Sequence, residues 1–131
     1  MKIYALRLQS GLDLRHEINK FVLSKDIKAG VILTCVGNLT KAILRMPDGK
    51  LIKQYTGSFE IVSLVGTVEA GDEHIHISLS DKKGNVFGGH LKHGSLVGVT
   101  AEIVIGEIEN MKFSRPLDKK TGYHELIIKK N

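Results

Sequence analysis

Short runs in which hydrophobic and polar residues alternate dominate the chain, and Gly, Asp or Asn separates most of these runs. A period of two is typical of strands with one buried face, and closely spaced strands joined by turn residues favour an antiparallel sheet. The predicted strands are Lys2–Leu8, Val31–Val36, Thr40–Met46, Leu51–Thr56, Glu60–Glu69, His74–Ser80, Val86–Leu91, Val97–Ile108 and Glu125–Lys129. No internal repeat or linker divides them, so residues 1–131 are predicted to form one domain.

Only the segment from Asp13 to about Ser24 has helical periodicity. Its hydrophobic residues Leu14, Ile18 and Val22 recur on one face, and Asp13 and Glu17 place negative charge in the first turn, where the helix dipole favours it. The opposite side is polar. The segment is therefore predicted to be a helix that lies on one face of the sheet.

The stretch from Glu73 to Leu91 predicts a specific β-hairpin. Residues 81–85 suit a three-residue loop closed by Gly84, a turn that pairs Asp81 with Asn85. Counting back from this pair predicts the partners Leu79 with Phe87, Ser78 with Gly88, Ile77 with Gly89, His76 with His90, and Ile75 with Leu91. A slip by one residue would place His90 among the isoleucines, so the hydrophobic pattern supports the same register.

This register predicts a three-histidine metal site. His74 and His76 share the polar face of one strand, and His90 lies opposite His76. Directly opposed Cβ atoms are about 5 Å apart, close enough for three imidazoles to reach one divalent ion. Imidazole ligands suit zinc best, with iron, copper or nickel as alternatives. The fourth ligand is left open between water, substrate, Glu73, Glu102 and another subunit. A solvated strand face without metal is the alternative interpretation.

Composition limits the remaining possibilities. The chain is 42% hydrophobic and 25% charged, as expected of a globular protein, and it has no Trp and few aromatic residues, which argues against a stacking surface for single-stranded nucleic acid. The only cysteine, Cys35, lies in a hydrophobic run and is predicted to be buried and reduced. No run is long enough for a membrane span and no signal peptide is evident, so a cytoplasmic protein without a membrane partner is expected.

The net charge of +5 is concentrated at the C-terminal end. Residues 1–110 are nearly balanced, whereas residues 111–131 hold only two acidic residues against six basic ones. A basic segment of this kind is a candidate for phosphate contacts or is ordinary charged surface. The candidate nucleic-acid-binding residues are Lys112, Arg115, Lys119, Lys120, Lys129 and Lys130.

Four segments together resemble the Plants and Prokaryotes Conserved (PPC) domain family: Leu6–Leu14, Gly57–Gly66, His74–Leu79 and Gly88–Leu91. The resemblance implies an α+β fold with a mainly antiparallel β-sheet and one principal α-helix, assembled as a homotrimer and similar to acetolactate decarboxylase. It also implies that His74, His76 and His90 match the histidines that bind metal in prokaryotic members. Plant members join the domain to an Arg-Gly-Arg-Pro minor-groove motif. This chain has only Arg115-Pro116 and lacks that motif.

Two functions remain open at this point. The first is a homotrimeric DNA-binding or regulatory protein whose three-histidine site stabilises it or senses a small molecule. The second is a metal-dependent hydrolase or lyase that acts on a small carbonyl substrate, with Glu60, Glu73 or Glu102 as general base. An open coordination position that faces a cleft favours the second function, and a flat exposed site favours the first.

Overall fold

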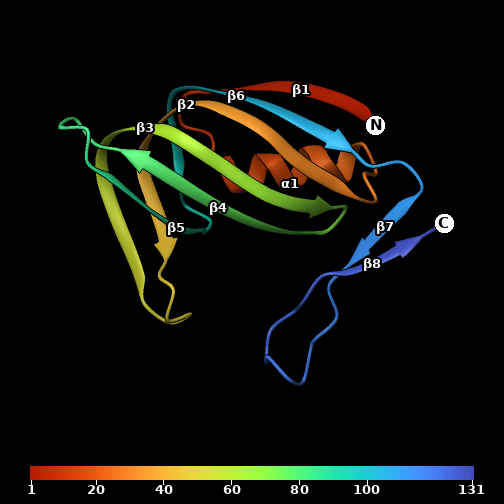
Figure 1. Cartoon of the computed structure of the whole chain (residues 1–131). Coiled ribbons are helices and arrows are strands. Elements are labelled where there is room, and N and C mark those ends of the chain that lie inside the picture. The colour runs from red at the N-terminus through yellow and green to blue at the C-terminus, as the bar shows by residue number, and fades with distance from the viewer.

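The computed structural model describes all 131 residues. They form a main β-sheet with a helix on one face, and the C-terminal residues form a small two-stranded ribbon (Figure 1). The elements in chain order are β1 (Lys2–Gln9), α1 (Leu14–Ser24), β2 (Gly30–Arg45), β3 (Ile52–Glu69), β4 (Asp72–Ser80), β5 (Val86–Leu91), β6 (Leu96–Glu107), β7 (Met111–Ser114) and β8 (Ile127–Lys130). The predicted fold class, a mainly antiparallel sheet with one principal helix, is confirmed.

All strand pairings in the main sheet are antiparallel, and the six strands lie in the order β1-β6-β2-β3-β4-β5. The end of β5 also pairs with β2, through Leu44 with Leu91 and Arg45 with His90. Strands β2, β3, β4 and β5 therefore form a closed ring. Closure matters for function because it brings the end of β2 against the histidine-bearing hairpin.

Four of the predicted strands are in fact halves of two long ones. The predicted strands Val31–Val36 and Thr40–Met46 form the single strand β2, and Leu51–Thr56 and Glu60–Glu69 lie within β3. The register between β2 and β3 shifts between Leu39 and Lys41, which marks a β-bulge. A bulge interrupts the alternation of a strand without ending it, so the pattern breaks where the strand continues.

The helix packs its hydrophobic face against the sheet as predicted. Leu14, Ile18 and Val22 are buried, and they belong to the same core as the inward residues of the strands. The helix begins at Leu14 because Asp13 is its N-cap, with Oδ1 accepting a hydrogen bond from the His16 amide at 3.0 Å. The other oxygen of Asp13 accepts from the Gly94 amide at 2.7 Å, which ties the helix start to the loop before β6. No helix has the length and hydrophobicity needed to cross a membrane.

Residues 110–131 form a small unit next to the main sheet. β7 was not predicted, and β8 begins two residues later than expected; the two strands pair with each other and with no strand of the main sheet (Figure 1). The Phe113 amide donates to the Lys28 carbonyl at 2.9 Å, and the buried Phe113 ring anchors β7. The loop between β7 and β8 returns toward the histidine hairpin.

Cys35 is buried and unpaired, as the sequence predicts. Burial raises the pKa of its thiol to about 12, and Glu102 adds to the rise. A thiol with such a pKa is neutral at physiological pH, and the neutral form is neither a good nucleophile nor a metal ligand. Cys35 is therefore a small core residue and belongs to no reactive site.

Candidate metal site and its cleft

The hairpin of β4 and β5 has the register that the sequence predicts. His76 lies opposite His90, and Ile77, Ser78 and Leu79 face their predicted partners. The loop is held by Asp81, whose carboxylate accepts from the amides of Lys83 and Asn85. One predicted pair differs. The ladder ends at His76 and His90, because Leu91 pairs with Leu44 of β2 instead of Ile75.

Gly88 lets the two strands of this hairpin come close. A Cβ atom at Gly88 would overlap the backbone carbonyl oxygen of Ile77, so no other residue fits without separating the strands. A Cβ atom at Gly89 would meet the Arg45 carbonyl oxygen at 2.9 Å. The paired glycines therefore allow β5 to fit tightly between β4 and β2, as required for the position of His90.

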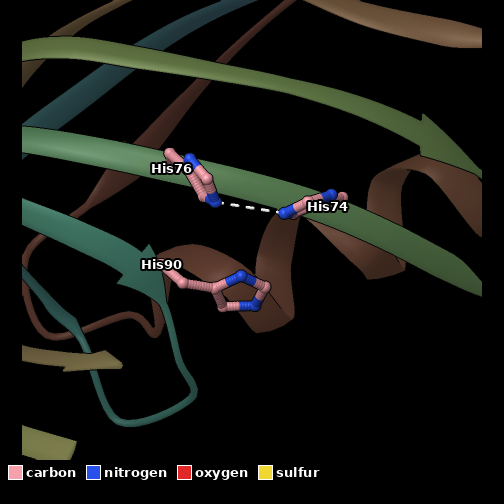
Figure 2. Close-up of side chains that lie close together, drawn as sticks. All are labelled: His74, His76 and His90. Carbon is pink, nitrogen blue, oxygen red and sulfur yellow. Dashed lines mark hydrogen bonds between the residues drawn. The ribbon is translucent and has the colours of Figure 1, made fainter. Parts of the chain in front are cut away.

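His74, His76 and His90 point toward a common space (Figure 2). One nitrogen from each ring can be chosen so that all three lie within 4.8 Å of one another. The Nε2 atoms of His74 and His76 are 3.0 Å apart, close to the roughly 3.3 Å that two zinc ligands at tetrahedral angles require. The rings are not stacked flat but meet edge-on or tilted, with centroids 4.8 to 5.5 Å apart. The predicted convergence of the three side chains is present in the structure.

The surroundings of His74 and His90 favour the neutral form of both imidazoles. Burial lowers the pKa of His90 to about 3, and the neighbouring Arg45 lowers it further. Burial also lowers the pKa of His74, with His76 as the second cause. Neutral imidazole is the form that binds a divalent ion, and three imidazoles without cysteine match the donor set of zinc sites with an open fourth position. The residues therefore fit a metal ion, which His74, His76 and His90 would hold.

The cluster lies in the wall of a cleft of about 660 Å³. The cleft combines the histidines with residues from the helix, the β2–β3 turn, β4, the end of β5 and the β7–β8 loop. Its charged and aromatic lining residues are Arg15, Arg45, Asp72, Glu73, His74, His76, His90, Lys92, Arg115, Tyr123, His124 and Glu125. The site is therefore concave and large enough for a small organic molecule.

The carboxylates singled out in the sequence are arranged differently from what was expected. Glu60 and Glu102 lie outside the cleft lining. Glu73 lines the cleft, but its side chain is only 3% exposed and forms an ion pair with Arg15 of the helix. Glu125 lines the cleft as well and acts on the charge of His74. Glu125 is in no ion pair, so its negative charge is not neutralised by a cation of the chain.

His124 also lines the cleft. Its Nδ1 atom is 2.9 Å from the Arg115 carbonyl oxygen. Tyr123 packs against Gly49 of the β2–β3 turn, and the Arg45 guanidinium lies 5.8 Å from the centre of its ring. Sequence reasoning missed Arg45, Lys92, Tyr123 and Glu125 because they reach the cleft only through strand closure and the path of the C-terminal loop.

The basic residues proposed for phosphate contacts fall into two groups. Lys112, Lys129 and Lys130 are exposed on the β7–β8 ribbon, and Lys119 and Lys120 are exposed in its loop. Arg115 is different: its side chain is 4% exposed, and its Nε atom is 3.0 Å from Oε1 of Glu69. It also donates hydrogen bonds to the Thr67 carbonyl and to Thr67 Oγ1, the latter at 2.7 Å. The guanidinium thus faces oxygens of β3, with Nε at ion-pair distance from Glu69 and Nη2 donating to Thr67.

The fold and the cleft define a mainly antiparallel α+β domain with a three-histidine cluster at the junction of β4 and β5. The chain belongs to the Plants and Prokaryotes Conserved domain family, abbreviated PCC or PPC, whose model matches residues 1–109. The structure is similar to that of a hypothetical protein from Salmonella enterica, with 38% identity, a TM-score of 0.95, and 99% and 94% of the two chains covered.

A protein from Archaeoglobus fulgidus described as metal-containing is also similar, with 29% identity, a TM-score of 0.80, and coverage of 97% of this chain and 94% of the other. Among curated proteins, the bifunctional protein GlmU of a Synechococcus strain is 38% identical over 130 residues. That match covers 99% of this chain, and the chain spans about a fifth of the length of the curated relatives it matches.

More distant structures share the fold alone. A Staphylococcus aureus protein of unknown function, described as similar to alpha-acetolactate decarboxylase, aligns with a TM-score of 0.53 at 16% identity, covering 83% of this chain and 54% of the other. The predicted likeness of fold to acetolactate decarboxylase is therefore confirmed. A Bacteroides thetaiotaomicron protein with a provisional DNA-binding name aligns with a TM-score of 0.82 at 20% identity, covering 97% and 91% of the two chains.

Proposed function

We propose that this chain binds a zinc ion through His74, His76 and His90 and acts on a small carbonyl compound as a metal-dependent hydrolase or lyase. The observation that carries the proposal is the position of the three-donor cluster in the wall of a 660 Å³ cleft. Three protein ligands and an adjoining cavity are the arrangement of catalytic metal sites, which leave a position for water or substrate. Structural zinc sites are closed by four protein ligands instead.

The bound ion would supply a Lewis acid for a carbonyl oxygen or lower the pKa of a water molecule. The residues of the chain have separate tasks around it. Glu125 accepts or returns a proton beside His74. The ion pair between Arg15 and Glu73 fixes the helix to the start of β4, next to His74. Tyr123 and His124 form part of the cleft wall.

The zinc proposal predicts a clear result in elemental analysis. Protein purified without a histidine tag is expected to contain about one equivalent of zinc, and His90→Ala is expected to lose most of it, because two imidazoles hold the ion far more weakly than three. His16→Ala, on the exposed side of the helix, is the matched control and should retain the metal. Equal metal in His90→Ala and the unaltered protein contradicts the site.

The same samples test the enzymatic part. Zinc-loaded protein is compared with metal-free protein and with Glu125→Gln on small esters and small keto acids. We expect turnover only with zinc, and a drop of about 100-fold or more in Glu125→Gln if Glu125 is the general base. Full metal content without turnover of any compound favours the regulatory function, in which the cleft only senses its ligand.

We also propose that the protein assembles as a homotrimer, as the family resemblance implies. The supporting observation is a set of aliphatic side chains exposed on the strands of the main sheet. These residues are Leu33, Val36, Val62, Val65 and Val99, each at least 48% exposed. Exposed aliphatic side chains on a sheet favour association with another copy. A solution mass of three times the 14.4 kDa protomer is the expected result.

A second candidate function, direct DNA binding, has support from the β7–β8 ribbon. Lys112 lies directly opposite Lys129 in the ladder, and both are exposed. Opposed like charges repel one another, so an anionic partner would relieve them. If the ribbon contacts DNA, anisotropy with a labelled duplex should show affinity that falls steeply with salt, and Lys112→Gln should reduce the log–log slope by about one. Absence of binding at low salt rejects this function.

A further inference from the structure

The cations of the cleft are not equivalent. Arg15 is neutralised by Glu73, and Arg115 by Glu69. Arg45 and Lys92 line the same cleft, and neither has a carboxylate within ion-pair distance. Two positive charges without protein partners therefore remain beside the three-histidine cluster.

Arg45 is held in place, but its Nε atom lacks a hydrogen-bond acceptor. Its backbone pairs with His90 at the strand closure, and its guanidinium lies 5.8 Å from the centre of the Tyr123 ring. Its terminal nitrogen is 3.4 Å from His90 Nδ1, a long contact. The Nε atom is buried and has no partner. A buried donor without an acceptor is costly, so an acceptor is expected from outside the protein chain.

Lys92 is the second cation of this kind, and it follows His90 by two residues. Its backbone is fixed by the hydrogen bond from its amide to the Ile43 carbonyl at 2.9 Å. Its side chain lines the same cleft as Arg45, and two cations without carboxylate partners in one cleft attract anions.

Asp72 and Glu125 are the cleft carboxylates that form no ion pair, and both have partners other than Arg45 and Lys92. Thr121 Oγ1 donates a hydrogen bond to the Glu125 carboxylate at 3.0 Å. Asp72 accepts a hydrogen bond from the Glu73 amide at the start of β4. Neither carboxylate lies within ion-pair distance of Arg45 or Lys92, so both cations remain available to an anion.

We propose that Arg45 and Lys92 form an oxyanion subsite, and that the natural ligand of the cleft is a small organic anion whose carboxylate or phosphate group binds there. The remainder of the molecule then extends toward the three histidines. The position of the anion next to a metal rests on the proposed function, but the subsite itself consists only of protein side chains. A planar guanidinium and a nearby ammonium match either a carboxylate or a phosphate.

The Nε–H group of Arg45 gives a direct readout in ¹⁵N–¹H NMR spectra of the 14.4 kDa protein. Metal-free protein is titrated with lactate and, separately, with inorganic phosphate, each against chloride at matched ionic strength. We expect the Arg45 Nε–H proton signal to move downfield and to saturate, because the group acquires an acceptor. The probe that saturates at the lower concentration identifies the preferred oxyanion. No movement, or an equal movement with chloride, overturns the proposal.

Variants separate this subsite from the metal site. In the variants, binding of the preferred probe is followed through the backbone amides of Gly89 and of residue 92. Arg45→Gln and Lys92→Gln should each weaken the preferred probe by about tenfold, the usual size for one charge-assisted hydrogen bond. Lys53→Gln, exposed on β3, is the control and should bind normally. Unchanged affinity in both cleft variants, with native melting curves, overturns the subsite.

Repeating the titration with zinc-loaded protein distinguishes the two proposals. If both are correct, zinc should strengthen lactate binding, because the carboxylate and hydroxyl groups of lactate then reach both the cations and the ion. Zinc uptake without any shift at Arg45 leaves the metal site standing and removes the anion subsite. A saturable shift at Arg45 in protein that takes up no zinc leaves the anion subsite standing and removes the metal site.

Discussion

Arg115→Ala is expected to lower the free energy of unfolding by about 3 kcal/mol, because it leaves the buried Glu69 carboxylate without its cation. The two side chains are 4% and 8% exposed, and Arg115 also donates to Thr67. The same contacts attach residues 110–131 to β3. Chemical denaturation measures the loss, and hydrogen exchange should show that the β7–β8 ribbon loses protection first.

The loss should depend on pH. Burial already raises the pKa of the Glu69 carboxyl more than Arg115 lowers it. Without Arg115 this pKa rises further, so the folded state binds a proton more readily than the unfolded state. The penalty is then complete above the raised folded-state pKa, shrinks as the pH falls through that pKa, and is gone below the unfolded-state value of about 4.3. A larger loss at pH 4 than at pH 7 would contradict this account.

Two comparisons isolate the ion pair. Lys112→Ala, on the exposed side of β7, should change stability by less than about 0.5 kcal/mol. The double variant Arg115→Met with Glu69→Leu removes both charges and should recover most of the loss, since hydrophobic replacements of a buried pair are often neutral. If the double variant is as unstable as Arg115→Ala, the loss comes from packing or the Thr67 hydrogen bonds.

Gly88→Ala is expected to weaken zinc binding by about tenfold to a hundredfold without altering a ligand. The new methyl group would overlap the Ile77 carbonyl oxygen, so β4 and β5 must separate at the Ser78–Gly88 pair, two residues from His76 and His90. Changes around metal ligands typically cost this much affinity. The overlap should also destabilise the fold by about 1–3 kcal/mol. Competition with a zinc-sensitive dye measures the affinity.

Val86→Ala is the control for this substitution. Val86 lies on the same strand, is 61% exposed and contributes no ligand. It should bind zinc normally and change stability by less than about 0.5 kcal/mol. If Gly88→Ala binds zinc as tightly as Val86→Ala does, close contact between β4 and β5 is not what positions the histidines.

The histidine hairpin could be predicted because the residues that determine its register lie close together in the sequence. The turn at Asp81–Asn85 fixes the register, and the alternation of Ile75, Ile77 and Leu79 fixes which face is buried. A period-two pattern excludes a slip by one residue, and the turn excludes a slip by two. The positions of His74 and His76 on one strand, and of His90 opposite His76, then follow by counting.

The rest of the cleft depends on contacts between distant parts of the chain. Arg45 reaches His90 because the end of β2 pairs with β5, and Glu125 arrives from the loop between β7 and β8. Arg115 looked like a surface cation in the sequence, because nothing near it indicates that Glu69, 46 positions earlier, lies beside it. Local patterns contain no signal for such pairings.

The residues of the cleft come from two parts of the chain, and the family model covers only one of them. The family model matches residues 1–109, which include all three histidines, whereas Tyr123, His124 and Glu125 lie beyond that match. Exchanging the terminal ribbon and its loop between relatives would thus remodel one wall and leave the three histidines untouched. Under the proposed function, selectivity for a ligand and the chemistry at the histidines can in this way evolve separately within a single small domain.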